Sequence, residues 1–404
     1  MAVLLAMVMM MVACSLSLFA FAVGEEEDPT LPESVENLNI HSYVHFGDSM
    51  STGYMLGATQ DEINAFNVQT TEDGGFAFPT GNPHTTTHDR FNPYQYGSYP
   101  SLIAEAFGLS EDQWYSFARE GLTTNDIHRI MDPSYYSQMD DQGKRNSDKA
   151  FETLFGTPQN GAEELAFLNA KAAEMLPKVD LVTFGMGPND IIISPLFDVL
   201  FKLQDATAGN TLYSQIAHTA INTATSLVQN YDIVAAYQTL FDAADVIGSL
   251  PEILAAVGLS LARGYMAVQQ NWEAAVNLVR SVNDHAIIVC IGGYNATRDL
   301  QFADIDLYRV GRNMGIFTTI MNLYWANSCS LRDQYYFVDI RNVDLPTWPT
   351  MVAWPGLLTG GGFMGYFMYC SHPSEKGHAQ IADAVLDTLF QEDGTNTLPV
   401  TSLL

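Results

Sequence analysis

A serine and a histidine that could together perform acyl transfer lie far apart in the chain. Ser49 follows the short apolar run 44–46 in the turn Gly47-Asp48-Ser49, and His372 lies in a loop just before an amphipathic segment. Transfer of an acyl group from an ester needs a nucleophile, a base that removes its proton, and donors directed at the oxygen that becomes negative. We therefore take Ser49 as the candidate nucleophile and His372 as its candidate base.

Two other turns could supply the hydrogen-bond donors. Gly121 ends the turn 117–121, where a glycine allows the backbone to approach closely, and Asn189 lies in the turn 187–190 after an apolar run. We expect the backbone N–H groups of Ser49 and Gly121 and the side-chain amide of Asn189 to converge on one oxygen. The alternative is structural, because glycine and asparagine are also favoured in turns for their backbone conformation alone.

Four motifs, taken in sequence order, resemble those of the SGNH/GDSL hydrolase superfamily. They are Phe46-Gly47-Asp48-Ser49, Phe117-Ala118-Arg119-Glu120-Gly121, Gly187-Pro188-Asn189-Asp190, and His372-Pro373-Ser374 with Gly377-His378. In that family the first carries the serine nucleophile, the second and third carry the glycine and asparagine oxyanion donors, and the last carries the base. The last motif is most similar to that of the phospholipase B-like secreted lipases and esterases. The resemblance implies a serine ester hydrolase.

One position departs from the family pattern. The family's last motif has an aspartate three residues before the histidine, where it orients the imidazole ring, and this chain has Tyr369 there. Three interpretations follow: a Ser–His dyad whose ring is held by a backbone carbonyl near Tyr369, a carboxylate from elsewhere such as Asp339 or Asp344, or a site that has lost activity. His378 is the alternative base, although we expect it to pack inside the following helix.

Five short apolar runs predict the strands that position these residues. They cover 44–46, 114–117, 179–184, 286–291 and 335–340, with helix-compatible segments between them. This alternation predicts an α/β fold, a three-layer sandwich whose five-stranded, mostly parallel sheet is covered by helices on both faces. The family resemblance implies an SGNH-hydrolase-like, flavodoxin-like topology.

Two longer segments interrupt this pattern. Residues 195–284 have apolar positions at helical spacing, and we expect a helical insertion of several helices there, either as cover for the sheet or as a cap over the substrate cleft. Residues 61–92, rich in Thr, Gly, Asn and Pro, predict a long surface loop.

The first residues have the pattern of a secretory signal peptide. An apolar run without a charge covers 2–23, and four acidic residues follow it at 25–28. We expect a leader at 1–24 and a single hydrolase domain at 25–404; the alternatives are an uncleaved anchor and lipid modification of Cys14. The expected location is extracellular or the lumen of the secretory pathway, a lysosome-like vacuole included.

The charge balance and the residue patterns exclude several classes of partner. Seventeen Lys and Arg stand against 46 Asp and Glu, which gives a net charge of −29 and excludes nucleic acid as a partner. The histidines do not cluster with cysteines or carboxylates at the spacing of zinc sites, and Gly360-Gly361-Gly362 lacks the lysine of a phosphate loop. We therefore expect neither a metal ion nor a cofactor.

Removal of the leader leaves three cysteines. Cys290 lies in an apolar run typical of a buried strand, while Cys329 and Cys370 lie in polar, loop-like surroundings. We expect one free thiol and a candidate disulfide between Cys329 and Cys370. The sequon Asn295-Ala296-Thr297 predicts glycosylation at Asn295, in the loop after that strand.

The expected substrate follows from the resemblance and from one apolar segment. Residues 345–368 contain many aromatic and aliphatic side chains; they either line the cleft and favour an acyl chain or pack against helices. The similarity to phospholipase B-like lipases makes phospholipid or lysophospholipid esters the first candidates, with transient contact to a membrane surface. The alternatives are a carbohydrate O-acetyl esterase and an inactive lipid- or glycan-binding protein on the same scaffold.

Overall fold

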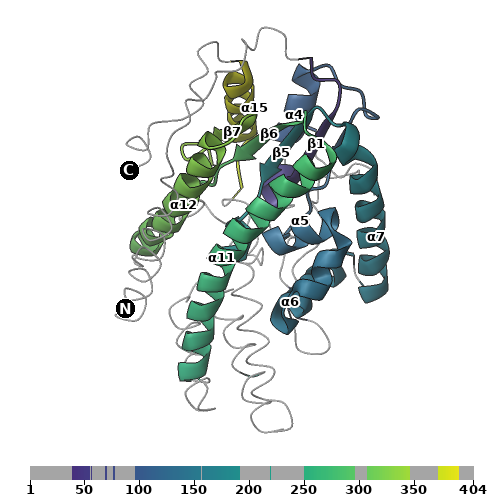
Figure 1. Cartoon of the computed structure of the whole chain (residues 1–404). Helices are drawn as coiled ribbons and strands as arrows, with labels where there is room; N and C mark the ends of the chain where they lie inside the picture. Colours follow the sequence, from purple (N-terminus) through teal and green to yellow (C-terminus); the bar gives the residue numbers. More distant parts are fainter. Residues whose placement is uncertain are drawn as a thin grey trace.

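The strands predicted from the sequence form one parallel sheet. A computed structural model of the chain describes residues 39–54, 56, 69–70, 76–77, 96–155, 157–191, 219, 250–295, 307–345 and 372–390. These residues contain a five-stranded sheet with helices on both faces (Figure 1), so the predicted α/β sandwich is confirmed. Across these ranges, no helix is long and apolar enough to cross a membrane.

The order of the strands places the candidate site. The sheet consists of β1 (Tyr43–Gly47), β4 (Trp114–Ser116), β5 (Leu181–Gly185), β6 (Ile287–Ile291) and β7 (Tyr335–Val338). The order is β4-β1-β5-β6-β7, and all neighbouring pairs are parallel. This is the flavodoxin-like order, in which ligands bind beyond the carboxyl ends of the strands where the chain reverses its direction of winding. Here that point lies between β1 and β5, which Ser49 and Asn189 follow.

Alternate residues of the strands form two cores, one on each face of the sheet. Val44 and Phe46 of β1 pack in one apolar cluster, and Tyr43 packs in the other. Because side chains alternate between the two faces of a strand, His45 points to the same face as Tyr43. Every residue of β1 and of β5 is buried, which explains why these strands read as continuous apolar runs.

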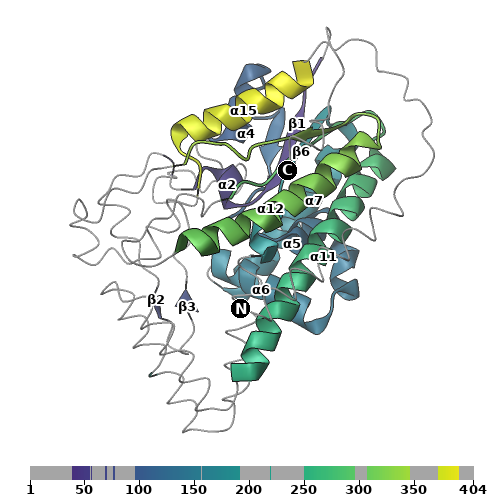
Figure 2. The same ribbon diagram turned by 90° about the vertical axis from the view of Figure 1, so that its left-hand side faces the viewer.

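Helices cover the two faces unequally. The face to which Tyr43 and His45 point is the first face. It carries α4 (Tyr99–Ala106) and α15 (Glu375–Phe390), which contact each other, together with the short helix α2 (Ser49–Thr52). The face to which Val44 and Phe46 point is the second face, and it carries α5 (Thr124–Met131), α6 (Asp141–Phe155), α7 (Pro158–Met175), α11 (Leu250–Val282) and α12 (Leu307–Ser330). Figure 2 shows α4 and α15 on one side of the strands and α5, α7, α11 and α12 on the other.

The remaining elements are short. Two 3-10 helices cover Pro133–Gln138 and Leu176–Lys178. The segment 61–92, expected as a loop, contains the antiparallel strands β2 (Gln69–Thr70) and β3 (Phe76–Ala77). Of the predicted helical insertion, the described part from residue 250 onward is one helix of 33 residues, α11; apart from residue 219, the part before it lies outside the described residues.

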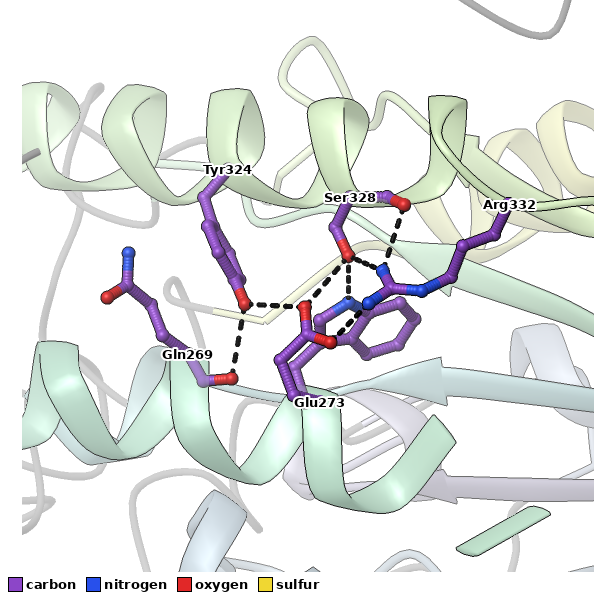
Figure 3. A network of polar contacts seen from close by, with 6 residues as sticks. Gln269, Glu273, Tyr324, Ser328 and Arg332 are labelled. Atoms are coloured by element: carbon purple, nitrogen blue, oxygen red, sulfur yellow. Dashed lines mark hydrogen bonds and ion pairs between the residues drawn. The ribbon is translucent and has the colours of Figure 1, made fainter. Parts of the chain in front are cut away.

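A polar network fastens α11 to α12 at the edge of the second face (Figure 3). Glu273 accepts hydrogen bonds from the hydroxyls of Tyr324 (3.0 Å) and Ser328 (3.2 Å) and pairs with the Arg332 guanidinium. The indole N–H of Trp272 donates to Ser328 Oγ at 2.8 Å, so the buried tryptophan is joined to the same network. Apolar burial and this network together fix the two helices against the sheet.

The cysteines differ from the sequence-based expectation. Cys329 is not in a polar loop: helix α12 places it in the core, where its free thiol donates to the carbonyl oxygen of Tyr336 at 3.6 Å. The expected disulfide to Cys370 is therefore not formed by Cys329, and Cys370 itself lies outside the described residues. Cys290 is a buried free thiol in β6, as its apolar surroundings predict.

Candidate active site

Ser49 stands at the first position of α2, directly beyond β1. The side chain of Asp48 caps this helix by accepting a hydrogen bond from the backbone N–H of Met50 at 3.0 Å. A side chain at Gly47 would overlap Ser51 Oγ, so the turn between strand and helix requires glycine. Helix α2 ends after one turn at Gly53, whose φ of 73° is in the left-handed region. The tight turn thus holds Ser49 at the carboxyl end of β1.

His372 lies beside Ser49 although 323 residues separate them in the chain. The distance between His372 Nε2 and Ser49 Oγ is 2.8 Å, a hydrogen bond between candidate base and nucleophile. The imidazole is 8% exposed, and the ring of Tyr54 packs against it with centroids 4.9 Å apart. Ser374 caps α15 by accepting the backbone N–H of Gly377 at 3.0 Å, so the last helix fixes the loop that carries His372.

The candidate oxyanion donors lie around Ser49. Gly121 has a φ of 76°, a conformation that favours glycine. Within the described ranges, no acceptor is assigned to the backbone N–H of Ser49 or of Gly121. The Nδ2 of Asn189 donates to the carbonyl oxygen of Leu122 at 2.9 Å and to Asp48 Oδ2 at 3.3 Å. The amide therefore lies between the turn that carries Ser49 and the turn that carries Gly121.

A buried arginine organises the turn before Gly121. The guanidinium of Arg119 donates to the carbonyl oxygens of Ser116 (3.2 Å) and Ala118 (2.8 Å) and forms an ion pair with Glu164 at 3.2 Å. The backbone N–H of Arg119 also donates to the carbonyl oxygen of Gly47 at 3.4 Å. A buried charge that is both paired and hydrogen-bonded is tolerated in a protein interior. Sequence reasoning missed this role, although Arg119 lies within the second motif.

Asp190 joins the third motif to the second. Its carboxylate accepts the backbone N–H of Thr124 at 2.9 Å and the hydroxyl of Thr124 at 2.7 Å, at the start of α5. Gly264 of α11 lies so close to the carbonyl of Asp190 that a side chain there would overlap it. Asp190 was not identified from the sequence; its position next to Asn189 was the available signal.

The buried charges around the site have shifted pKa values. Burial raises the pKa of the Asp48 carboxyl to about 7, against the opposing effect of the Met50 N–H. Burial also raises the pKa of Asp190 to about 7, partly offset by its hydrogen bonds from Thr124. Burial lowers the pKa values of His45 and His378 to about 3, so both rings are neutral near pH 7. In the described chain, no group of three His, Cys, Asp or Glu side chains could hold a metal ion.

Comparison with protein families identifies the chain. The profile of GDSL-like lipases and acylhydrolases matches residues 43–385, which include all four motifs. The chain belongs to the GDSL-like lipase/acylhydrolase family. It is accordingly a carboxylic ester hydrolase. No curated protein matches it significantly.

Several solved structures of lipases and esterases are similar to this GDSL hydrolase. An extracellular lipase from Streptomyces rimosus has 14% identity and a TM-score of 0.36, with 85% of this chain and 99% of that chain covered. A phospholipase A1 from Streptomyces albidoflavus has 15% identity and a TM-score of 0.35, with 86% and 99% covered. A family two carbohydrate esterase from Clostridium thermocellum has 14% identity and a TM-score of 0.30, with 86% and 62% covered.

The candidate third members of this GDSL site either bond to other side chains or lie outside the described residues. Asp339 pairs with the Arg341 guanidinium through two nitrogens, at 2.9 and 2.7 Å. Asp344 accepts the Ser374 hydroxyl at 2.5 Å and faces Lys376 Nζ at 3.6 Å. Both carboxylates are thus engaged by other side chains. Tyr369 lies outside the described residues.

His378 does not stand beside Ser49. Its ring is fully buried in α15, and its Nδ1 accepts the backbone N–H of Tyr99 at 3.2 Å. Asn295, in the candidate sequon, is half-buried just after β6.

Proposed function

We propose that this GDSL hydrolase is a secreted serine esterase that cleaves acyl esters of phospholipid or lysophospholipid through an acyl-enzyme. The observation that carries the catalytic assignment is the 2.8 Å hydrogen bond between His372 Nε2 and Ser49 Oγ. A hydroxyl is a weak nucleophile at neutral pH, and a neutral imidazole within hydrogen-bond reach removes its proton as it attacks.

Acylation proceeds in two stages. Ser49 Oγ attacks the ester carbonyl carbon while its proton passes to His372 Nε2, and the carbonyl π electrons move onto oxygen. The tetrahedral intermediate then collapses, the bond to the alcohol oxygen breaks, and His372 donates the proton to the departing alcohol. Deacylation repeats these stages with water: His372 takes a proton from the attacking water and returns it to Ser49 Oγ as the carboxylic acid leaves.

The negative oxygen needs donors that are already in place. The N–H groups of Ser49 and Gly121 support this role because no acceptor is assigned to them in the described ranges. Asn189 is the third donor; its bond to Asp48 Oδ2 is long at 3.3 Å, and its bond to Leu122 orients the amide. We expect the substrate oxygen to replace Asp48 as the acceptor of that N–H.

The lipid substrate is supported by sequence features. The last motif is similar to that of phospholipase B-like lipases, and the apolar segment 345–368 immediately precedes His372. That segment, apart from Leu345, lies outside the described residues. Transient binding at a membrane surface is part of the proposal, because a phospholipid substrate is presented there.

A carbohydrate O-acetyl esterase is the second candidate. The same four motifs serve that chemistry, and the polar segment 61–92, rich in Thr, Gly, Asn and Pro, offers hydroxyl and amide groups that bind sugar hydroxyls.

The secretory features complete the proposal. Cleavage of a leader at 1–24 would leave one hydrolase domain at 25–404, with a glycan at Asn295 exported with it. The leader lies outside the described residues. N-terminal sequencing of the protein secreted by a eukaryotic host tests this part, and an intact N-terminus would contradict it.

The activity is tested by hydrolysis of phosphatidylcholine, lysophosphatidylcholine, p-nitrophenyl esters of two and twelve carbons, and acetylated xylan. Labelling with a fluorophosphonate probe runs in parallel, with Ser49→Ala and His372→Ala as controls. We expect fatty-acid release that both substitutions abolish, and labelling that requires Ser49. Preference for acetylated xylan would select the second candidate. Folded wild-type protein that neither labels nor hydrolyses any of these esters would overturn the proposed function.

A further inference from the structure

A chain of buried hydroxyls lies behind the nucleophile, on the face of the sheet covered by α4 and α15. Ser51, two residues after Ser49 in α2, forms a hydrogen bond of 2.7 Å through its Oγ with the hydroxyl of Tyr99. That hydroxyl also lies 3.2 Å from Nε2 of His45, in the strand that leads to Ser49. None of the three side chains is exposed. The one-turn helix of the nucleophile is therefore fastened to Tyr99 of α4 through a side chain.

The same tyrosine contacts the helix that follows the base. Its backbone N–H donates to His378 Nδ1 at 3.2 Å, and the two rings are stacked with centroids 5.9 Å apart. His378 lies six residues after His372, in the first turn of the helix that fixes the loop of the base. Tyr99 thus bonds both to the nucleophile's helix and to the helix next to His372.

The histidine at position 378 reduces the stability of the fold. Because Nδ1 accepts a hydrogen bond and the ring is neutral, Nε2 carries the proton. Nε2 is buried, and among the described residues it has no hydrogen-bond partner. An unsatisfied buried donor reduces stability, and an apolar side chain of similar size would avoid that cost. A role in alignment, rather than in packing, accounts for a histidine here.

Two glycines make room for the chain of hydroxyls. A side chain at Gly47 would overlap Ser51 Oγ and come within 2.5 Å of His45 Nε2, and one at Gly185 would overlap the hydroxyl of Tyr99. These glycines end β1 and β5, the strands that lead to Ser49 and Asn189. Both strands thus end in the residue type that the hydroxyl of Tyr99 and its partner require.

We propose that Tyr99 is a positioning residue that keeps Ser49 Oγ and His372 Nε2 at hydrogen-bonding distance. Its hydroxyl bonds to Ser51, and its backbone N–H bonds to His378. The inference rests on the proposed function, in which Ser49 Oγ and His372 Nε2 exchange a proton. Small displacements of reacting groups lower the rate strongly, by up to about 100-fold for 1 Å. Loss of the Ser51–Tyr99 bond removes one of the few side-chain contacts that anchor this single helical turn, beside the Asp48 cap and the bond from Thr52 to Glu120.

The test compares Tyr99→Phe, Ser51→Ala and the double variant, with a short soluble p-nitrophenyl ester. We expect kcat to fall about tenfold in each single variant, which is within the range that a sub-ångström displacement of the reacting groups produces. We expect KM within about twofold of wild type, and the same fold reduction in the rate of fluorophosphonate labelling. Because both substitutions break the same bond, between Ser51 and Tyr99, kcat of the double variant should be no lower than that of either single variant.

Tyr324→Phe is the matched control. It also removes a tyrosine hydroxyl that joins two elements, since that hydroxyl donates to Glu273 at 3.0 Å between α12 and α11. It should lower Tm to a similar extent and leave kcat unchanged. If Tyr99→Phe does not fold, Ser51→Ala decides by the same criteria.

The outcomes separate this inference from the proposed function. A folded Tyr99→Phe or Ser51→Ala variant with the kcat of Tyr324→Phe overturns the positioning role, as does a double variant in which the two losses multiply. Wild-type protein without esterase activity or Ser49 labelling overturns the proposed function, and the inference with it.

Discussion

The two faces of the sheet are packed in different ways. On the face of α11 and α12, the largest buried side chains are apolar or aromatic, with Phe184 and Trp272 in edge-to-face contact at 5.7 Å. On the face of α4 and α15, polar groups lie inside the core: Tyr43 and His45 both bond to Thr183 Oγ1, at 2.7 and 2.6 Å. The α11 face also has buried polar contacts, but the one between Trp272 and Ser328 joins two helices, whereas Tyr43, His45 and Thr183 belong to the strands themselves. The second arrangement lies directly behind Ser49.

The largest expected effect is a loss of stability on the α11 face. Trp272 is fully buried and its indole bonds to Ser328, so Trp272→Ala should lower the free energy of unfolding by about 3–5 kcal/mol. Below the melting transition, kcat should remain near wild type because the residue does not contact the site. Urea unfolding and ester hydrolysis at 15 °C measure the two quantities. A kcat loss as large as that of a site residue would remove the distinction between the faces.

Asn189→Ala should lower kcat strongly, in contrast to Trp272→Ala, which should lower stability. Loss of one oxyanion donor should reduce kcat by about 10²- to 10³-fold, with KM little changed. The matched control is Asn283→Ala, which removes a buried amide that donates to the carbonyls of Leu176 (2.9 Å) and Val179 (2.7 Å), at the opposite end of the strands. The control should destabilise the protein and keep its kcat. Equal kcat values for the two variants would contradict the oxyanion role.

Asp190→Asn should change how stability depends on pH. The folded carboxyl has a pKa of about 7, above its unfolded value, so the folded state retains a proton that the unfolded chain releases. Its contribution is therefore present below about pH 4 and is lost as pH rises through about 7. Asparagine keeps an acceptor for Thr124 but does not titrate. The stability of wild type relative to Asp190→Asn should fall between pH 4.5 and 7.5.

Urea unfolding at these two pH values measures the effect. The control is Asp112→Asn: the exposed Asp112 carboxyl has its pKa lowered by the Ser110 hydroxyl, so it is ionised at both pH values and its contribution should not change between them. A pH-independent difference between wild type and Asp190→Asn would show that Asp190 is ionised in the fold at both pH values.

Glu273→Gln should have the smallest effect. The side chains of Glu273 and Arg332 are 36% and 28% exposed, so solvent screens their ion pair. We expect a loss of about 0.5–1 kcal/mol in unfolding free energy and no change in kcat. Thermal unfolding in low and high salt measures this, since a screened pair should contribute less in high salt. A loss above about 2 kcal/mol would mean that this polar network, and not the apolar core, fixes α11 on α12.

Local patterns in the sequence determined much of the fold. The apolar runs predicted all five strands because parallel strands covered on both faces need buried residues at nearly every position. Ser374 caps α15, and capping of this kind depends only on neighbours within four residues along the chain. The motif order nominated Ser49 and His372, which the structure brings to 2.8 Å. The family resemblance was needed for that step, since a single Gly-Asp-Ser turn has many structural uses.

The parts of the fold and of the site that local patterns did not predict were decided by contacts between distant segments. Cys329 reads as a loop residue until α12 packs its face on β7. The bond from Tyr99 to His378 joins residues 279 positions apart, so no local pattern records it. Propensity and periodicity act over a few residues along the chain, whereas burial and hydrogen bonding act between neighbours in space. The sequence by itself therefore determined the strands and the chemical groups, and only the tertiary structure decided which groups meet.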